Sequence, residues 1–101
     1  SVVMRIARQT AGHASGAVLF VSRAAAATCF ANRCRSLRAI VGSCPEAVDQ
    51  GVSELAANVL IVEYPYHDRP RMREMVRRFI DADRPALPEV DRRLRELEQC
   101  A

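Results

Sequence analysis

Three short apolar runs alternate along the chain with longer segments in which apolar and polar residues are mixed. Each run consists mainly of apolar side chains, and the three runs are Ala17–Val21, Leu37–Val41 and Asn58–Val62. A continuous apolar run of this length is typical of a β-strand that is buried on both faces. The sequence therefore predicts three strands of a covered sheet.

The segments around these runs have the composition and spacing of helices. Most carry apolar residues three or four positions apart, which places them on one helix face. Proline begins several of them, where its missing N–H has no intrahelical partner to lose. Gly51 weakens its own helix by roughly 1 kcal/mol relative to alanine. The predicted helices are Val2–Ala11, the segment from Ala24 to the polar turn at Arg33–Ser36, Pro45–Ala56, Pro70–Ile80 and Pro88 to about Gln99.

Strands that alternate with helices of about ten residues form parallel sheets with right-handed crossovers. The fold class is therefore α/β, a three-layer α/β/α Rossmann-like open parallel sheet of at least three strands. We expect this sheet to be incomplete, because so apolar an edge strand normally has a neighbour. The Ala17–Val21 strand is expected to be central or next to an interface.

Two regions are predicted. Residues 1–87 form the α/β domain, which is partial, and residues 88–101 form a C-terminal helix that docks on it or dimerises. That helix carries an apolar stripe of Val90, Leu94 and Leu97, too apolar to remain in water.

A ligand of an open α/β sheet binds at the carboxyl ends of the strands, where helix N-termini present unpaired N–H groups. Here that location is Ser22, Arg23 and Ala24, with Ser22 predicted as the helix N-cap. Either Ser22 and Arg23 bind an anion, or they are only a cap and a solvated arginine. Tyr64 and His67 follow another strand end, and they either line the pocket or pack on a partner.

Charge and composition exclude several classes of partner. The 101 residues have a net charge of +3. The first 45 residues hold six Arg and no acidic residue, whereas the rest hold nine Arg and twelve acidic residues. The arginines are spread across predicted strands and helices, and with no Trp there is no stacking platform for bases, so nucleic acid is not an expected partner. No run is long enough to span a bilayer, so a membrane is not expected either.

The cysteines follow no ligand pattern. They form no C-x-x-C pair and no zinc spacing, so we expect no metal site, and no motif indicates a cofactor. Free thiols are typical of a reducing cytoplasm, which is the expected location. A disulfide or a redox role is the alternative. The four are Cys29, Cys34, Cys44 and Cys100.

The pattern from Gly16 to Ile80 resembles the C-terminal half of the ribose-5-phosphate isomerase B family, which includes the galactose-6-phosphate isomerase subunits. GAVLFVSRAAAATCFANR resembles the family's glycine-rich strand, loop and helix. LRAIVGSCPEA and AANVLIVEYPYHDRPRMREMVRRFI resemble the two strand–helix segments that follow, and DRRLREL resembles the tail more weakly. The resemblance implies the family's fold and an activity on phosphorylated sugars.

The same resemblance implies that the catalytic groups are missing. The family's cysteine base falls on Val21, the glutamate that replaces it in some members falls on Ala27, and the ring-opening histidine falls on Glu54. Among the positions of the phosphate contacts, Arg92 stays basic. The loop glycines fall on Ser22, Ala24 and Ala26, and other family positions fall on Leu55, Pro65, Glu89 and Val90.

The hypothesis is a sugar-phosphate-isomerase-like domain that has lost its catalytic residues and serves as a binding or assembly module. One alternative is an active isomerase of altered specificity, completed by a missing N-terminal half or a partner subunit. Another is a phosphate- or nucleotide-binding module. The expected partners are a phosphorylated sugar or phosphate, and either a second copy in a homodimer or the missing half.

Overall fold

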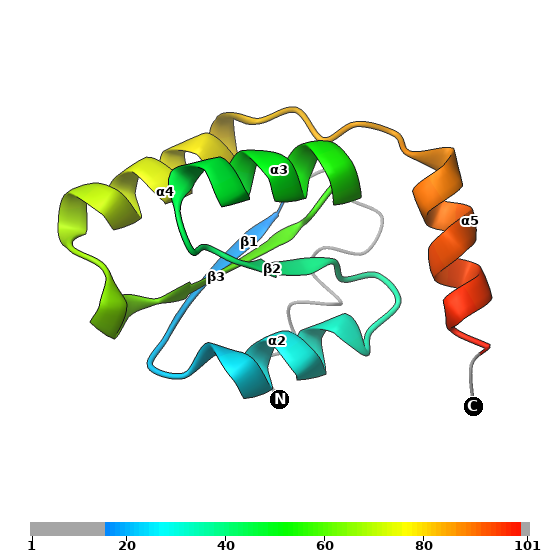
Figure 1. Cartoon of the computed structure of the whole chain (residues 1–101), viewed down its shortest axis with the longest axis horizontal. Coiled ribbons are helices and arrows are strands. Elements are labelled where there is room, and N and C mark those ends of the chain that lie inside the picture. The colour runs from blue at the N-terminus through cyan, green and yellow to red at the C-terminus, as the bar shows by residue number, and fades with distance from the viewer. Residues whose placement is uncertain (1–15, 100–101) are drawn as a thin grey trace.

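The computed structural model describes residues 16–99, so the predicted helix Val2–Ala11 and Cys100 lie outside the described residues. Three strands and four α-helices follow one another, with a short 3₁₀ helix η1 before the third helix (Figure 1). They are β1 (Ala17–Val21), α2 (Ala24–Asn32), β2 (Ala39–Val41), α3 (Pro45–Leu55), β3 (Val59–Glu63), η1 (Tyr64–Tyr66), α4 (Arg69–Asp81) and α5 (Pro88–Leu97).

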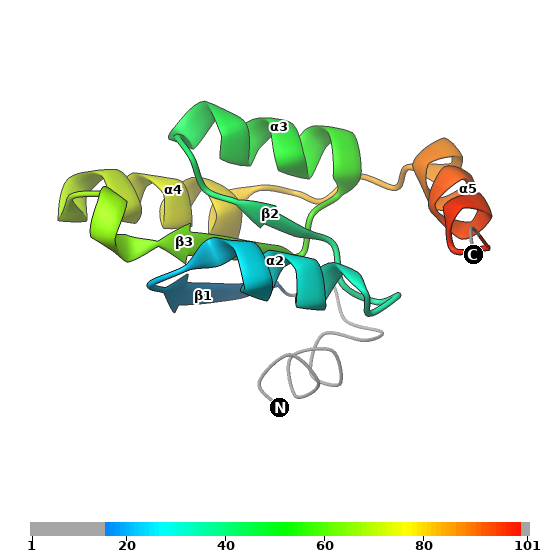
Figure 2. The ribbon, with the colours of Figure 1, turned by 60° about the horizontal axis from the view of Figure 1, so that its bottom comes forward.

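The strands form one parallel sheet in the order β1-β3-β2, which confirms the predicted fold class. Of the two positions expected for Ala17–Val21, the central one is wrong, because β3 lies between the other two strands, and a position next to an interface stays a prediction. The crossover from β1 to β2 leaves one strand position open between them, and β3 occupies that position. Since both crossovers are right-handed, this reversal of direction places α2 and α3 on opposite faces of the sheet (Figure 2).

Each face of β3 contributes to a separate core. Val59 and Ile61 point toward α2, whereas Leu60 and Val62 point toward α3 and α4, as the alternation along a strand requires. The residues of β3 from Val59 to Val62 are fully buried. Within the described sheet, β3 is the strand that pairs on both edges, and its side chains on both faces are fully buried.

Two side-chain amides shorten the predicted second strand. Asn58 accepts a hydrogen bond from the Arg38 N–H at 2.8 Å and donates to the Ser36 carbonyl. Asn32 pairs with both backbone groups of Ala39, at 2.7 and 3.0 Å. Because these amides satisfy backbone groups that a strand ladder would otherwise pair, β2 begins at Ala39 rather than Leu37.

Gly51 has a packing role that outweighs its low helix propensity. A Cβ at this position would lie 2.4 Å from Cδ1 and 3.0 Å from Cγ2 of Ile40. The glycine therefore lets α3 approach β2 closely, which an alanine would prevent without movement of Ile40.

Helix α5 lies at one end of the molecule (Figure 1). Arg38 forms an ion pair with Asp91, and Arg35 pairs with Glu98 at 3.3 Å. Within the predicted apolar stripe, Val90 and Leu94 are half-buried, while Leu97 is 51% exposed. Across residues 16–99, no helix has the length and apolar character needed to cross a membrane.

Candidate functional site

Three helices begin at the carboxyl edge of the sheet. The strands are parallel, so the turns after β1, β2 and β3 all lie at this edge and lead into α2, α3 and η1–α4. Each helix N-terminus carries partial positive charge and unpaired N–H groups. This edge is therefore where an anionic ligand would be expected to bind.

The N-terminus of α2 is occupied by a carboxylate from the chain itself. The Ala24 N–H donates to Oε2 of Glu63 at 2.6 Å. Glu63 is the last residue of β3 and pairs in register with Val21 of β1. Its side chain lies on the same face as those of Val59 and Ile61, which is the face that α2 covers. The strand register thus directs this carboxylate to the start of α2.

The other two N-termini also have acidic residues. Oδ1 of Asp68 accepts the Arg71 N–H at 2.9 Å and caps α4. Glu46 lies in the first turn of α3. A backbone hydrogen bond at Glu46, a hydrogen bond with Cys44 and the positive charges of nearby arginines lower the pKa of this carboxyl. All three helix starts at this edge therefore face negative charge from the protein.

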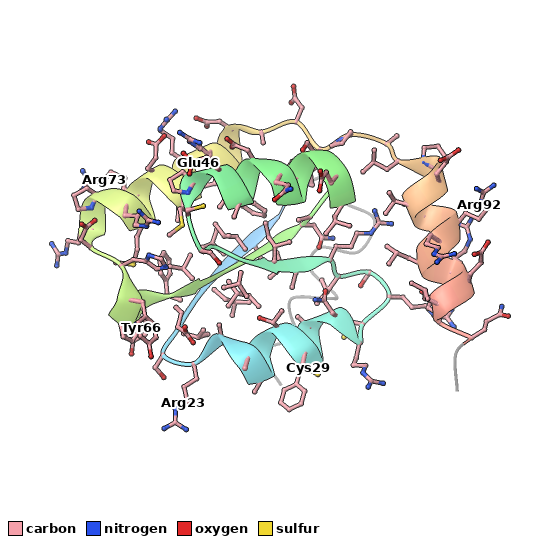
Figure 3. The ribbon with its side chains drawn as sticks, in the orientation of Figure 1. Arg23, Cys29, Glu46, Tyr66, Arg73 and Arg92 are labelled. Carbon is pink, nitrogen blue, oxygen red and sulfur yellow. The ribbon has the colours of Figure 1, made fainter. Side chains whose placement is uncertain are left out.

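The predicted N-cap at Ser22 is wrong. Arg23 occupies the N-cap position in extended conformation and makes no capping bond with its side chain. Glu63 satisfies the helix N–H in place of a local serine hydroxyl, because it reaches the site from the neighbouring strand. Ser22 and Arg23 are both exposed at the edge, and Arg23 points away from the sheet (Figure 3).

The turn after β3 adds aromatic side chains to the same edge. Tyr64 and Tyr66 are exposed in η1. His67 is half-buried, and its Nδ1 atom is shielded from solvent with no hydrogen-bond partner among the described residues. Tyr64 and His67 thus share the carboxyl edge with Ser22, Arg23 and Ala24, as predicted from the strand ends.

Two predicted site residues lie elsewhere in this chain. Glu54 is exposed in the last turn of α3, near the opposite edge of the sheet. Arg92 is exposed on α5, at the far end of the molecule from Tyr66 and Arg23 (Figure 3). Val21 and Ala27 do lie at or near the carboxyl edge, but both are half-buried and pack against the core under α2.

The larger hollow in the described surface also lies away from this edge. It has a volume of about 580 Å³ and is lined by the end of α2, the start of β2 and the inner side of α5. No group of three or more metal-ligating side chains occurs within residues 16–99.

Glu63 is the site residue that sequence reasoning missed. The available signal was a carboxylate at the end of an apolar strand, two residues after Ile61 and so on the same face. Its partner could not be read from the sequence, because Ala24 is 39 positions away and becomes adjacent only through the β1–β3 pairing.

No protein-family model matches the chain, and no curated protein does. Among solved structures, the chain is similar to ribose 5-phosphate isomerase B from Anaplasma phagocytophilum, with a TM-score of 0.74 and 21% sequence identity. The alignment covers 96% of this chain and 63% of that one, so this chain spans less than two thirds of that protein's length. The expected fold is confirmed: it is that of ribose 5-phosphate isomerase B.

Proposed function

We propose that the chain is an isomerase-B-like domain that has lost sugar-phosphate isomerisation and acts as a binding or assembly module. The observation that carries this proposal is the Glu63 carboxylate, which accepts the Ala24 N–H at 2.6 Å. A phosphate or enediolate oxygen would need the N–H groups at this helix start. The protein's own carboxylate already uses one of them.

The charge of Glu63 also opposes a second anion. Two like unit charges about 4 Å apart repel by about 4 kcal/mol at the effective dielectric constant of a protein surface. Asp68 and Glu46 add negative charge at the neighbouring helix starts. Arg23 supplies a nearby cation, but it is solvent-exposed and is held by no side-chain cap contact.

The chemistry of an aldose–ketose isomerase requires a base near the reacting carbons and donors aimed at the developing oxyanion. The resemblance places that base on Val21 or Ala27, which have no ionisable group. It places the ring-opening group on Glu54, which lies near the other edge of the sheet. We therefore assign no catalytic role to these three positions.

The test is an isomerase assay of the purified chain with ribose 5-phosphate. We expect no conversion to ribulose 5-phosphate above background. General acid–base groups each contribute about 10² to 10⁴ in rate, so the loss of two or more leaves little activity. The triple variant Val21→Cys, Ser22→Gly, Glu54→His should gain little, because Glu63 still occupies the start of α2. Robust turnover by the unmodified chain would refute the proposal.

Glu63 itself favours one alternative, an isomerase of altered specificity completed by a missing half or a partner subunit. It is paired in register with Val21, the position that the resemblance gives to the base, and lies on the same face of the sheet. If the unmodified chain turns over substrate and Glu63→Gln abolishes that turnover, this carboxylate is the base and the alternative is correct.

The remaining alternative is an anion-binding module at Ser22 and Arg23. A thermal melt with inorganic phosphate distinguishes it from the proposed function. In a thermal melt, phosphate should not stabilise the unmodified chain more than an equal ionic strength of chloride does. A phosphate-specific stabilisation that Arg23→Gln removes would instead favour the anion-binding module.

The proposed assembly role uses α5. Its stripe of Val90, Leu94 and Leu97 is only partly covered by the rest of the chain. A second copy that packs on this stripe would complete its burial and form a homodimer.

A further inference from the structure

A second apolar surface lies between strand β1 and helix α4. A groove of about 450 Å³ is lined by Phe20, Met72 and Val76, together with the arginines Arg69, Arg73 and Arg77. Phe20 is 55% exposed. Among the described residues, β1 pairs only with β3 and so forms an edge of the sheet (Figure 2).

Helix α4 is covered on one flank and open on the other. Its inner side carries Met75 and Phe79, which are buried in the core. One flank is joined to α3 through the Arg78–Asp49 ion pair at 2.8 Å. The opposite flank bears Ile80, which is 67% exposed and shares a helix face with Val76. We call Phe20, Val76 and Ile80 the apolar strip: Phe20 and Val76 line the same groove, and Ile80 lies one helical turn beyond Val76.

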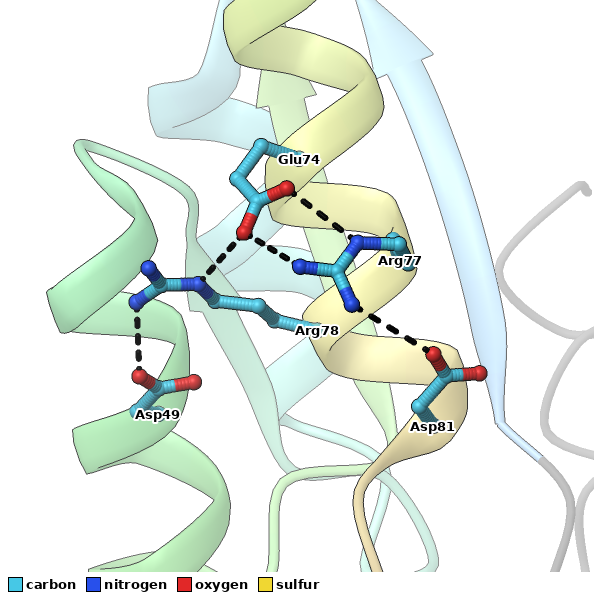
Figure 4. Close-up of polar contacts among 5 residues, drawn as sticks. All are labelled: Asp49, Glu74, Arg77, Arg78 and Asp81. Carbon is cyan, nitrogen blue, oxygen red and sulfur yellow. Dashed lines mark hydrogen bonds and ion pairs between the residues drawn. The ribbon is translucent and has the colours of Figure 1, made fainter.

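Positive charge follows this strip at regular intervals. Arg69, Arg73 and Arg77 are four residues apart and form a row about 12 Å long on the helix surface. Arg77 is neutralised within its own helix by Glu74 and Asp81 (Figure 4). Arg69 and Arg73 form no ion pair with any residue from 16 to 99. Arg69 and Arg73 thus have no acidic partner within residues 16–99.

We infer that this surface binds an acidic amphipathic helix of another polypeptide, which packs beside α4 and covers Phe20. The helix presents apolar side chains to Phe20, Val76 and Ile80. It presents carboxylates four residues apart to Arg69 and Arg73, because that spacing matches the arginine row. The inference rests on the proposed binding role and names a surface and a partner chemistry for it.

Charge excludes the other occupants. A second copy docked through this same face would bring its own arginine row against this one. Residues 1–15 hold two arginines and no acidic residue, so they offer no carboxylate to the row either. An acidic partner satisfies both the apolar strip and the two arginines.

The test uses two synthetic helical peptides and fluorescence anisotropy on the full chain. Both peptides carry the same leucine stripe; one has glutamates four residues apart beside it, and its twin has lysines there. At about 50 mM salt, where charges are weakly screened, the acidic peptide should bind at least about tenfold more tightly than its twin, since each exposed pair contributes modestly. Equal binding of the two peptides, or no binding, overturns the inference.

Variants locate the binding surface. The double variant Arg69→Glu, Arg73→Glu should reverse the preference between the peptides, and Phe20→Thr should weaken binding of both. The matched control is Arg95→Glu, an exposed helical arginine on α5, which should leave binding unchanged. An equal loss in the control variant overturns the inference.

Two further measurements test whether a second copy of the chain or residues 1–15 occupy the groove. If the chain is a dimer that Phe20→Thr converts to a monomer, a second copy occupies the groove and the inference is wrong. If the acidic peptide binds only after residues 1–15 are deleted, that segment occupies the groove and the inference is likewise wrong. Neither result depends on isomerase turnover, so a failure here is distinguishable from a failure of the proposed function.

Discussion

At the scale of single residues, Glu63 determines the character of the carboxyl edge. It ends the central strand, faces α2 and serves as the cap that the local sequence of α2 does not provide. A side chain that caps a helix from a distant strand links local helix stability to the sheet register. This residue therefore connects the stability of the fold with the proposed loss of an anion site.

Replacement of this carboxylate should destabilise the domain. Glu63→Ala removes the acceptor for the Ala24 N–H, and loss of a helix cap costs about 0.5–2 kcal/mol. Glu63→Gln should cost less, because its amide oxygen still accepts the hydrogen bond. Urea unfolding measures both changes. Glu54→Ala, on an exposed glutamate of α3, is the control, and a Glu63→Ala chain as stable as this control would contradict the capping role.

At the scale of elements, the sequence predicted which segments form strands, but it did not predict the order of those strands in the sheet. The three apolar runs are local features, so all three strands were predicted, β1 with its observed bounds. The order β1-β3-β2 depends on which gap the third strand enters, and no local pattern encodes that choice. The late start of β2 likewise depends on Asn32 and Asn58, whose amide contacts cross between elements.

The pair of α3 and α4 is held on its outer side by a charged network. Glu74 accepts hydrogen bonds from Arg77 and Arg78, and Arg78 continues to Asp49 on α3 (Figure 4). Hydrogen bonds from Arg77 and then Arg78 lower the pKa of the Glu74 carboxyl below its usual value. The network therefore depends on an ionised Glu74.

The variant Glu74→Gln should lower the melting temperature slightly, and the effect should depend on pH. Because the folded-state pKa is lowered, the contribution of Glu74 is present above the unfolded value of about 4.5 and is lost as the pH falls through the folded-state value. Wild type and variant should therefore differ near neutral pH and converge in acid. High salt should also reduce the difference, because these groups are partly exposed to solvent. A difference that persists unchanged in acid would contradict this role.

At the scale of the whole molecule, the sheet topology determines which predicted site residues lie together. Parallel strands put their carboxyl ends at one edge, so Ser22, Arg23, Tyr64 and His67 were brought there by topology alone. The charge of that edge was not predictable, because Glu63 reaches it through strand pairing. Glu54 and Arg92 lie elsewhere in this chain, since helix α3 carries Glu54 to the opposite edge and α5 carries Arg92 to the far end.

Helix α5 is the part of the molecule whose attachment is weakest. Neither core cluster includes a residue of α5. The helix is tied to the body by ion pairs of Arg38 and Arg35, and a hollow of about 580 Å³ separates its inner side from the end of α2 and the start of β2. Exposed ion pairs contribute little to stability. The body should therefore fold without α5.

Truncation after Ala86 tests whether α5 serves assembly. The truncated chain should melt within about 5 °C of the full chain, which corresponds to about 1 kcal/mol for a domain of this size. It should also show a smaller associated size in light scattering, because the stripe of Val90, Leu94 and Leu97 is gone. The control is Leu97→Lys in the full chain, which keeps the helix but charges its exposed end, and should also reduce association. A truncated chain that keeps the associated size of the full chain would exclude assembly through α5.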